Sequence, residues 1–356
     1  MIRTLFAALA LALLAGCDTL ADVGYLRQSV AGHLDIVWRA KPVDDWIAAA
    51  DTDPALKERL QLARRIRDFA VTDLKLPDNQ SYRRYAALDR PAAVWNVVAA
   101  PELSLQLETW CYPVLGCVGY RGYYDRAAAD VLAGELRGRG LEVLVYGVPA
   151  YSTLGKTEWL GGDPLLSTFI HWPEGELARL IFHELAHQVA YAADDTEFNE
   201  SFATAVERLG GQRWLDAHAS AAARAEYAVF DGRRRDFKAL TLQVRQDLAA
   251  IYADPARDAA AKRAAKAARL ARLQAGYVAL KAGPWQGYAG YDRWFAQANN
   301  AAFGIQAAYD GLVPAFERLF EREGRDFGRF YAAVRQLADL PPSQRAATLA
   351  ALQPQS

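Results

Sequence analysis

One short segment limits the possible folds of this chain more than any other: His-Glu-Leu-Ala-His at residues 183–187. Residues four apart lie on one face of an α-helix, so both imidazoles can point at one cation while Glu184 lies beside them. The neighbouring residues 180–182 and Val189 are apolar, which indicates a buried helix. The fold must therefore bury this helix and bring a further ligand to it from another segment.

A second helix is predicted over residues 196–209, and it contains Glu200. The twelve residues between His187 and Glu200 are enough to end the first helix, turn, and bring the second helix back alongside it. A catalytic zinc site combines three protein ligands with one open position, and neutral imidazole suits Zn²⁺. We therefore predict one zinc ion per chain, held by His183, His187 and Glu200.

Other polar residues of the second helix leave alternatives open. Glu197 is a rival ligand, although an acid at a helix start is already explained by the helix dipole. Thr204 and Glu207 follow Glu200 by four and seven residues and share its face, so they can orient a ligating imidazole. Asn199, next to Glu200, is grouped with them as a supporting residue. A simple polar stripe on a helix is the alternative interpretation.

These motifs resemble those of the gluzincin zinc peptidases, and most closely those of a bacterial family of proposed zinc aminopeptidases. The similarity covers most of the chain beyond the first 16 residues. Its main motifs are His-Glu-Leu-Ala-His-Gln at 183–188 and Asn-Glu-Ser-Phe-Ala-Thr at 199–204, and further matching segments lie at 111–117, 151–155, 163–165 and 299–301. The resemblance implies that His183, His187 and Glu200 hold zinc and that Glu184 is the general base.

The expected fold is α+β: a mainly helical zincin with a small mixed β-sheet and two zinc-bearing helices. One feature of the better-known large zinc aminopeptidases is missing. Their Gly-x-Met-x-Asn segment, which helps bind the amino terminus of the substrate, is absent, because Met1 is the only methionine of the chain. Their two zinc motifs are also spaced further apart. We expect hydrolysis of peptide bonds, most naturally at amino termini. Without the Gly-x-Met-x-Asn segment, however, the sequence lacks the main feature that would indicate amino-terminal specificity.

The expected mechanism follows from charge. Two neutral histidines and one carboxylate leave a Zn²⁺ site at a net charge of about +1, which lowers the pKa of a bound water and polarises the scissile carbonyl. Glu184 would take the proton of that water and pass it to the leaving amine. Tyr288 and Tyr291, on a glycine-containing turn, are the candidates for a second oxyanion donor. Aromatic packing at a turn is the alternative.

Several polar residues upstream of the zinc helix are further candidates. Ser167 and Thr168 lie on a predicted strand that can pair with an extended peptide. Glu158 or Asp163 can anchor a substrate amine, although Asp163 also fits a turn before a proline. His171 can face the cleft, but we interpret all three histidines outside the motif as structural: His33, His171 and His218.

The first residues are typical of an export signal. Arg3 is followed by an apolar run of eleven residues at 5–15, which is too short to span a bilayer. Leu-Ala-Gly-Cys at 14–17 resembles the bacterial lipobox, which implies cleavage before Cys17 and a lipid on that residue. We expect a periplasm-facing lipoprotein of the bacterial cell envelope, and Asp18 favours the inner membrane. A buried first helix is the alternative.

Export places Cys111 and Cys117 in an oxidising compartment, where a pair separated by five residues can close a small loop. A disulfide is the favoured interpretation. A zinc knuckle would need further ligands, and none of the five histidines lies within thirty residues of this pair. Two buried free thiols are the remaining alternative.

The chain divides by pattern into four parts: a lipoprotein signal peptide at 1–16, a helical region at 17–90, the catalytic core at 91–215, and a helical region at 216–356. Within the core, strands are predicted at 94–98, 103–107, 141–146 and 165–172, and helices at 125–139, 174–192 and 196–209. The C-terminal part contains a long helical pair that breaks near Asp254.

Charge excludes one class of partner. A net charge of −1 lacks the electrostatic footprint of a nucleic-acid-coating protein. The second arm of the helical pair, residues 257–281, is locally basic with seven Lys or Arg and one acid. It is either a solvated helix face or a contact for anionic lipid.

Two other functions remain open. One is a non-catalytic zinc-containing envelope lipoprotein that binds peptides. Glu184 disfavours it, because a structural zinc site has no use for that acid. The other is a zinc hydrolase of non-peptide amides or esters.

Overall fold

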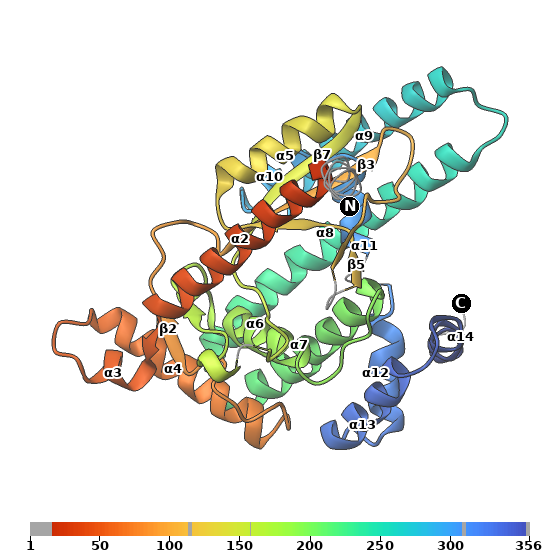
Figure 1. Cartoon of the computed structure of the whole chain (residues 1–356). Coiled ribbons are helices and arrows are strands. Elements are labelled where there is room, and N and C mark those ends of the chain that lie inside the picture. Colours follow the sequence, from red (N-terminus) through yellow and green to blue (C-terminus); the bar gives the residue numbers. More distant parts are fainter. Residues whose placement is uncertain (1–15, 113–115, 157, 308–310, 354–356) are drawn as a thin grey trace, which may run out of the picture.

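The computed structural model describes residues 16–112, 116–156, 158–307 and 311–353. The protein is mainly helical with small sheets, as expected for an α+β fold (Figure 1). Residues 1–15 of the predicted signal segment lie outside the described part of the chain, as does the side chain of Cys17. No helix in the described ranges is long and apolar enough to cross a membrane.

Helices form most of the N-terminal region, as predicted for residues 17–90. They are α2 (Gly16–Arg39), α3 (Val43–Ala48) and α4 (Pro54–Thr72). α4 begins at Pro54, because the proline fits the first helical turn and the Asp53 carboxylate accepts the Leu56 N–H at 3.1 Å. Ile66 and Phe69 of α4 are buried in the main core, where Phe69 meets Phe182 of the helix that carries the histidine pair.

The best-formed sheet has three antiparallel strands, with β3 (Val94–Pro101) between β6 (Arg121–Tyr123) and β7 (Leu141–Val148). Its side chains alternate between two covering helices, as the period of a strand requires. Val97 and Ala99 pack under α5 (Arg126–Gly138), whereas Val98 and Ala100 pack against α11 (Asn300–Ala307). The strands predicted at 94–98 and 141–146 are thus confirmed and somewhat longer. The helix predicted at 125–139 is confirmed with nearly the same bounds.

The described residues form two further, smaller sheets, whereas the sequence suggested a single mixed sheet. One orders β1 (Lys41–Pro42), β2 (Arg84–Ala86) and β8 (Leu165–Leu166), with β1 antiparallel and β8 parallel to β2. The other is the hairpin of β4 (Trp110–Tyr112) and β5 (Gly116–Val118), in which Cys111 and Cys117 are directly opposite and form the predicted disulfide. A short 3₁₀ helix, η1 (Glu158–Leu160), precedes β8.

One predicted strand is wrong, and another is much shorter than predicted. Residues 103–107 form no strand, because their alternating leucines serve two cores: Leu105 packs into the C-terminal aromatic cluster and Leu107 against α11. The strand predicted over 165–172 ends after Leu166. There the chain turns, and the Leu166 carbonyl accepts the N–H groups of Phe169 and Ile170 at 3.2 and 3.0 Å.

Helices dominate the rest of the chain. The histidine-bearing helix is α6 (Glu174–Ala186), shorter than predicted, and α7 (Thr196–His218) is longer and packs extensively along it. The long pair is α8 (Ala221–Ala253) and α9 (Ala259–Ala282), which break near Asp254 as predicted and extend as a hairpin from the body (Figure 1). The remaining helices are α10 (Asp292–Ala296), α12 (Val313–Arg322), α13 (Phe327–Ala338) and α14 (Pro342–Leu352).

Most basic side chains of the arm at 257–281 have acidic partners within the protein. Arg263 pairs with Glu102 at 2.8 Å, and Lys266 pairs with Glu142. The other pairs join Arg257 to Asp254, Arg269 to Asp247 and Lys281 to Asp292. These contacts use the charges that a lipid surface would need, and they favour the interpretation of the arm as a structural helix.

Phe202 of α7 is fully buried and joins the histidine-bearing helical pair to the C-terminal helices. Its ring lies 5.7 Å from Phe316 of α12 and 5.8 Å from Phe330 of α13, measured between centroids. We expect Phe202→Ala to lower the free energy of unfolding by about 3–5 kcal/mol, because it removes apolar contacts and leaves a cavity. Denaturant unfolding followed by circular dichroism measures this loss.

Val278→Ala is the control, since Val278 on α9 is 62% exposed and its truncation should change stability by less than about 0.5 kcal/mol. Equal effects of the two substitutions would mean that α7 does not depend on this aromatic contact.

Candidate metal centre

Three potential ligands from two helices converge in the interior. Nε2 of His183 lies 3.2 Å from Nε2 of His187 and 3.3 Å from Oε2 of Glu200, and His187 Nε2 lies 3.7 Å from the same oxygen. Tetrahedral zinc with bonds of about 2.0–2.1 Å separates its ligand atoms by about 3.4 Å. The spacing and chemistry of these three donors therefore fit a zinc ion.

Local backbone geometry keeps the two histidines on one face. α6 ends at Ala186, yet His187 retains helical angles of φ −58° and ψ −20°. Its side chain consequently still projects one turn after His183. The rest of α6 is anchored by Ile181, Phe182 and Leu185, which are fully buried in the main core.

Asn199 fixes the connection between the two helices. Its side-chain amide donates to the Ala192 carbonyl, its side-chain oxygen accepts the Ala192 N–H, and both distances are 2.8 Å. Asp195 caps α7 by accepting the Phe198 N–H at 3.0 Å and also binds Arg345 of α14. Asn199 thus supports the site by holding the preceding loop in place, and it directs Glu200 toward α6.

Glu207 contacts the first histidine from behind. Its Oε2 lies 3.0 Å from Nδ1 of His183, on the opposite side of the ring from the ligand nitrogen. Its other oxygen binds the guanidinium of Arg179, which is buried and also contacts Tyr227. A carboxylate in this place fixes the orientation and tautomer of an imidazole ligand. The geometry agrees with the role predicted for Glu207.

The electrostatics of the cluster favour positive charge at its centre. Burial opposes ionisation of Glu207, but Arg179 and His183 outweigh it and hold the pKa of Glu207 at about 2. Burial also disfavours a charged His183, yet hydrogen bonds to Glu200 and Glu207 raise the pKa of this imidazole well above its usual value. Burial lowers the pKa of His187 to about 4, so this ring is neutral, as a metal ligand requires.

Glu184 lines the same cavity as the three potential ligands, but its carboxylate has a different set of contacts. Within the described ranges, no hydrogen bond or ion pair engages its carboxylate, which lines the cavity beside His183 and His187. Burial raises the pKa of Glu184 to about 7, the range in which a carboxylate can both accept and release a proton near neutral pH.

The cluster lies in a cavity of about 630 Å³ that extends from α2 past the sheet to α8. Its lining is rich in aromatic side chains. Six tyrosines contribute, namely Tyr25, Tyr112, Tyr120, Tyr124, Tyr151 and Tyr191. Thr204 also lines it, next to Glu200 on the same helical face as predicted.

Tyr120 lines the same cavity as Glu184, Glu200 and Glu207. Burial is the main cause that raises the pKa of its phenol well above the usual value, and the charges of Glu200 and Glu184 add to it. The residue follows the disulfide hairpin, whose Cys117 N–H donates to Asp194 Oδ1 at 2.6 Å in the loop between α6 and α7. The hairpin is therefore fastened beside the cluster.

The prediction that Tyr288 or Tyr291 faces the site is wrong. Tyr291 stacks on Phe237 with 4.5 Å between ring centroids, and Tyr288 packs over the guanidinium of Arg233 at 4.1 Å. Neither residue lines the cavity. The glycine-containing turn directs both rings into the aromatic cluster between α8, α9 and α10.

The other candidates have structural partners. Ser167 bonds to Leu88 at 2.8 Å and Thr168 to the Pro149 carbonyl at 2.6 Å, so neither presents a free hydroxyl to a peptide. Asp163 is buried and accepts from Thr153 at 2.7 Å, and Glu158 accepts the Gln80 N–H at 2.6 Å. Neither acid lines the cavity.

The remaining rivals also lie elsewhere. Glu197 is exposed and outside the cluster, so α7 presents Glu200 and not Glu197. His171 is exposed, and His218 packs on Trp214 and Phe69. His33 bonds to Tyr151 at 2.9 Å, as expected for a structural histidine.

Sequence reasoning missed Tyr120 and Arg179. A usable signal for Tyr120 was its position three residues after Cys117, because a disulfide beside a binding site fixes the chain that follows it. Arg179 lies four residues before His183 on the same helix, so its proximity followed from helical spacing. A buried arginine among apolar residues pointed to a carboxylate partner.

A pair of histidines on one helix, a third potential ligand on the neighbouring helix and an unengaged acid define a candidate hydrolytic centre in an α+β fold. The family model described as "Putative aminopeptidase" matches residues 24–349. The chain therefore belongs to this family. No curated protein and no solved structure matches the chain.

We expect Glu207→Gln to weaken binding of zinc by about 10- to 100-fold, because an amide no longer supplies the negative charge behind His183. Competition with a chromophoric chelator measures this affinity. Glu197→Gln is the matched control, being the same substitution at an exposed position of the same helix, and it should leave the affinity unchanged. Equal affinities of the two variants would show that Glu207 does not support the ligand.

Proposed function

We propose that this protein is a zinc-dependent peptidase of the bacterial cell envelope, of gluzincin type and with amino-terminal preference. The observation that carries the proposal is the convergence of His183, His187 and Glu200 beside the unengaged carboxylate of Glu184. Membership of an aminopeptidase family supports hydrolysis of peptides as the reaction.

The donor set supports zinc as the metal. Two imidazoles and one carboxylate suit this borderline cation and, when it is bound, it would act as a Lewis acid toward water and the scissile carbonyl. His183 and His187 would bind through Nε2 and Glu200 through its carboxylate. Glu207 and Arg179 would hold His183 in the required orientation.

Glu184 is the proposed general base. Its carboxylate borders the cavity next to the ligand atoms, where it can take a proton from the attacking water and deliver it to the leaving amine. Its raised pKa fits both steps, since a strongly acidic carboxyl would be a poor proton acceptor.

Tyr120 is the proposed second donor to the oxyanion. Tyr120 lines the same cavity as the three potential ligands, and the charges of Glu200 and Glu184 act on its phenol, which supports this role. The raised pKa keeps the phenol protonated, so its O–H can donate a hydrogen bond to developing negative charge.

Amino-terminal preference rests on the family and not on an anchoring acid. Among the described residues that line the cavity, the carboxylates are Glu184, Glu200 and Glu207. Each of these has another role in the proposal. A free amine would therefore be recognised by backbone or phenol groups, or the enzyme would accept internal peptide bonds.

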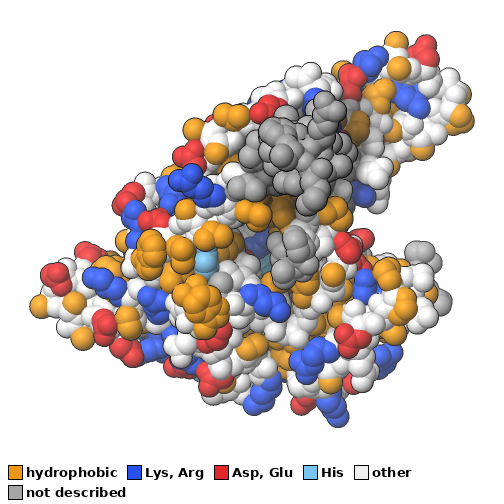
Figure 2. Space-filling view, viewed as in Figure 1, with side chains coloured by type: hydrophobic (Ala, Val, Ile, Leu, Met, Phe, Trp, Pro, Cys, Tyr) orange, Lys and Arg blue, Asp and Glu red, His pale blue; other side chains and the backbone are white. Residues whose placement is uncertain are grey.

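Attachment to the membrane is proposed through lipid on Cys17. That residue lies in the first turn of α2, and the same helix exposes Leu26, Val30 and Trp38. In Figure 2, hydrophobic side chains gather over α2 beside the hollow at the centre of this face. A short lipid tether and an apolar helix face both favour a position close to the bilayer.

We expect Glu184→Gln to retain one zinc per chain and to lose nearly all hydrolysis, because the amide cannot accept a proton. Elemental analysis measures the metal, and a panel of free-amine, blocked-amine and internal fluorogenic peptides measures activity, with and without chelator. A fully active Gln variant would remove the general-base role. A wild-type protein that binds these peptides without cleaving them would be a peptide-binding lipoprotein, and one that cleaves only non-peptide amides would be a different hydrolase.

We expect Tyr120→Phe to lower kcat by about 10²- to 10³-fold with little change in zinc content, because only the hydroxyl is lost. Steady-state kinetics on the best peptide of the panel measures this change. Tyr288→Phe is the matched control and should retain kcat, since Tyr288 lies outside the cavity. The opposite result for the two variants would restore the turn at 287–291 as the source of the donor.

A further inference from the structure

A second cavity of about 800 Å³ lies between α7, α8 and α12, behind the histidine-bearing helix. Charged side chains make up most of its lining. Seven are basic, namely Arg179, Arg208, Arg213, Arg234, Arg235, Lys238 and Arg325, and four are acidic, namely Asp216, Asp231, Glu317 and Glu321. The cavity therefore has an excess of positive charge in a protein whose net charge is −1.

Much of this charge is paired: Glu207 binds Arg179, Glu176 binds Arg234 at 2.5 Å, Glu317 contacts Arg208 and Glu321 contacts Arg325. The positive charge that these pairs leave over lies mainly on Arg213 and Arg235. Asp231 alone is shared by three guanidinium groups, at 3.7 Å from Arg179, 3.2 Å from Arg234 and 3.4 Å from Arg235. Arg213 donates to the backbone carbonyls of Asp73 and Arg325 and to no carboxylate among the described residues.

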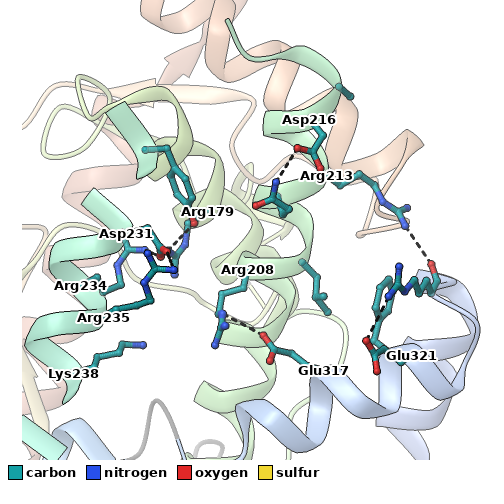
Figure 3. Close-up of a pocket in the computed structure, with 16 residues that line it drawn as sticks. Arg179, Arg208, Arg213, Asp216, Asp231, Arg234, Arg235, Lys238, Glu317 and Glu321 are labelled. Carbon is teal, nitrogen blue, oxygen red and sulfur yellow. Dashed lines mark hydrogen bonds and ion pairs between the residues drawn. The ribbon is translucent and has the colours of Figure 1, made fainter. Parts of the chain in front are cut away.

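Two of the cations can reach a ligand. Arg235 is 75% exposed, and its contact with Asp231 leaves other guanidinium donors toward the cavity. Arg208 is 48% exposed and contacts Glu317 at 3.2 Å through Nε. Figure 3 shows Arg235 and Lys238 from α8 and Arg208 from α7 directed into the same space between the helices.

This basic cavity adjoins the cavity of the metal centre. Lys238 lines both, and Phe237 next to it lines the metal-site cavity alone. Along α8 the lining residues Tyr227, Asp231, Arg234 and Lys238 are spaced by three or four positions, so one face of this helix lines the basic cavity and reaches the cavity of the metal centre at Lys238.

We propose that the basic cavity binds an acidic segment of the peptide substrate, whose scissile bond lies at the metal centre. The proposal rests on the function proposed above and adds a substrate class to it: peptides with Asp or Glu side chains distant from the cleaved bond. Guanidinium groups bind carboxylates through charge-assisted hydrogen bonds. The four carboxylates of the lining repel a dense polyanion, so a peptide with a few separated charges fits better than nucleic acid or a lipid surface.

The test measures binding without turnover. Zinc-loaded Glu184→Gln protein is titrated with two fluorescent peptides that are identical except for Glu or Gln at the positions distant from the scissile bond. Fluorescence anisotropy gives the two dissociation constants. We expect the Glu peptide to bind about 10-fold more tightly at low salt and the difference to shrink as salt screens the charges.

Arg208→Gln/Arg235→Gln, added to the same background, should abolish the difference between the two peptides. Both positions are exposed, and thermal unfolding verifies that the fold is retained. Arg137→Gln, on an exposed face of α5, is the matched control and should preserve the 10-fold difference. Equal binding of the two peptides, or a preference that survives the double substitution, would overturn the proposal.

Two further measurements distinguish failure of the basic-cavity proposal from failure of the proposed peptidase function. If the wild-type enzyme cleaves both peptides with equal kcat/KM, the basic cavity fails while the peptidase function stands. If no peptide is cleaved but the Glu peptide still binds more tightly, the peptidase function fails and the cavity is an acidic-peptide site. Loss of binding to anionic vesicles in the double variant, with no effect on either peptide, would assign the cavity to lipid instead.

Discussion

The packing of α6 along α7 places ionisable groups where water cannot solvate them, and the rest of the site depends on how their charges balance. Burying a charge is costly unless a partner compensates it. Arg179 compensates Glu207, Glu207 orients His183, and His183 faces Glu200. Each group is stabilised by the next, so the cluster holds a defined geometry. It favours positive charge at the point where the three potential ligand atoms meet.

The pairing of α6 and α7 was predictable because the residues that determine it lie close together in the sequence. Four-residue spacing placed His183 and His187 on one face, and the short interval to Glu200 required a second helix alongside. The cysteine pair was predictable for the same reason. Tyr120 and the basic cavity depend on segments that are far apart in sequence, since β6, α8 and α12 meet the site only in the folded chain. Local patterns also misassigned Tyr288 and Tyr291, because a glycine-containing turn does not show which way its rings point.

The basic residues of α9 had two possible roles in the sequence, and the structure favours one of them. In the structure, Lys266 binds Glu142 of β7, and Glu142 also accepts the Asn300 N–H at the start of α11. Arg263 binds Glu102 in the segment after β3. These ion pairs hold the hairpin against the sheet and α11, so the basic side chains stabilise the packing of these elements.

The disulfide hairpin of β4 and β5 helps to hold Tyr120 in place beside the cluster. The bond between Cys111 and Cys117 closes the strand pair that precedes Tyr120, and the same pair is anchored to Asp194 beside α7. Opening this bond would free the chain on one side of the phenol while leaving both histidines in place on their helix. In the proposed enzyme, a thiol reductant would then affect catalysis and metal binding separately, because Tyr120 and the two histidines are held in place by different contacts.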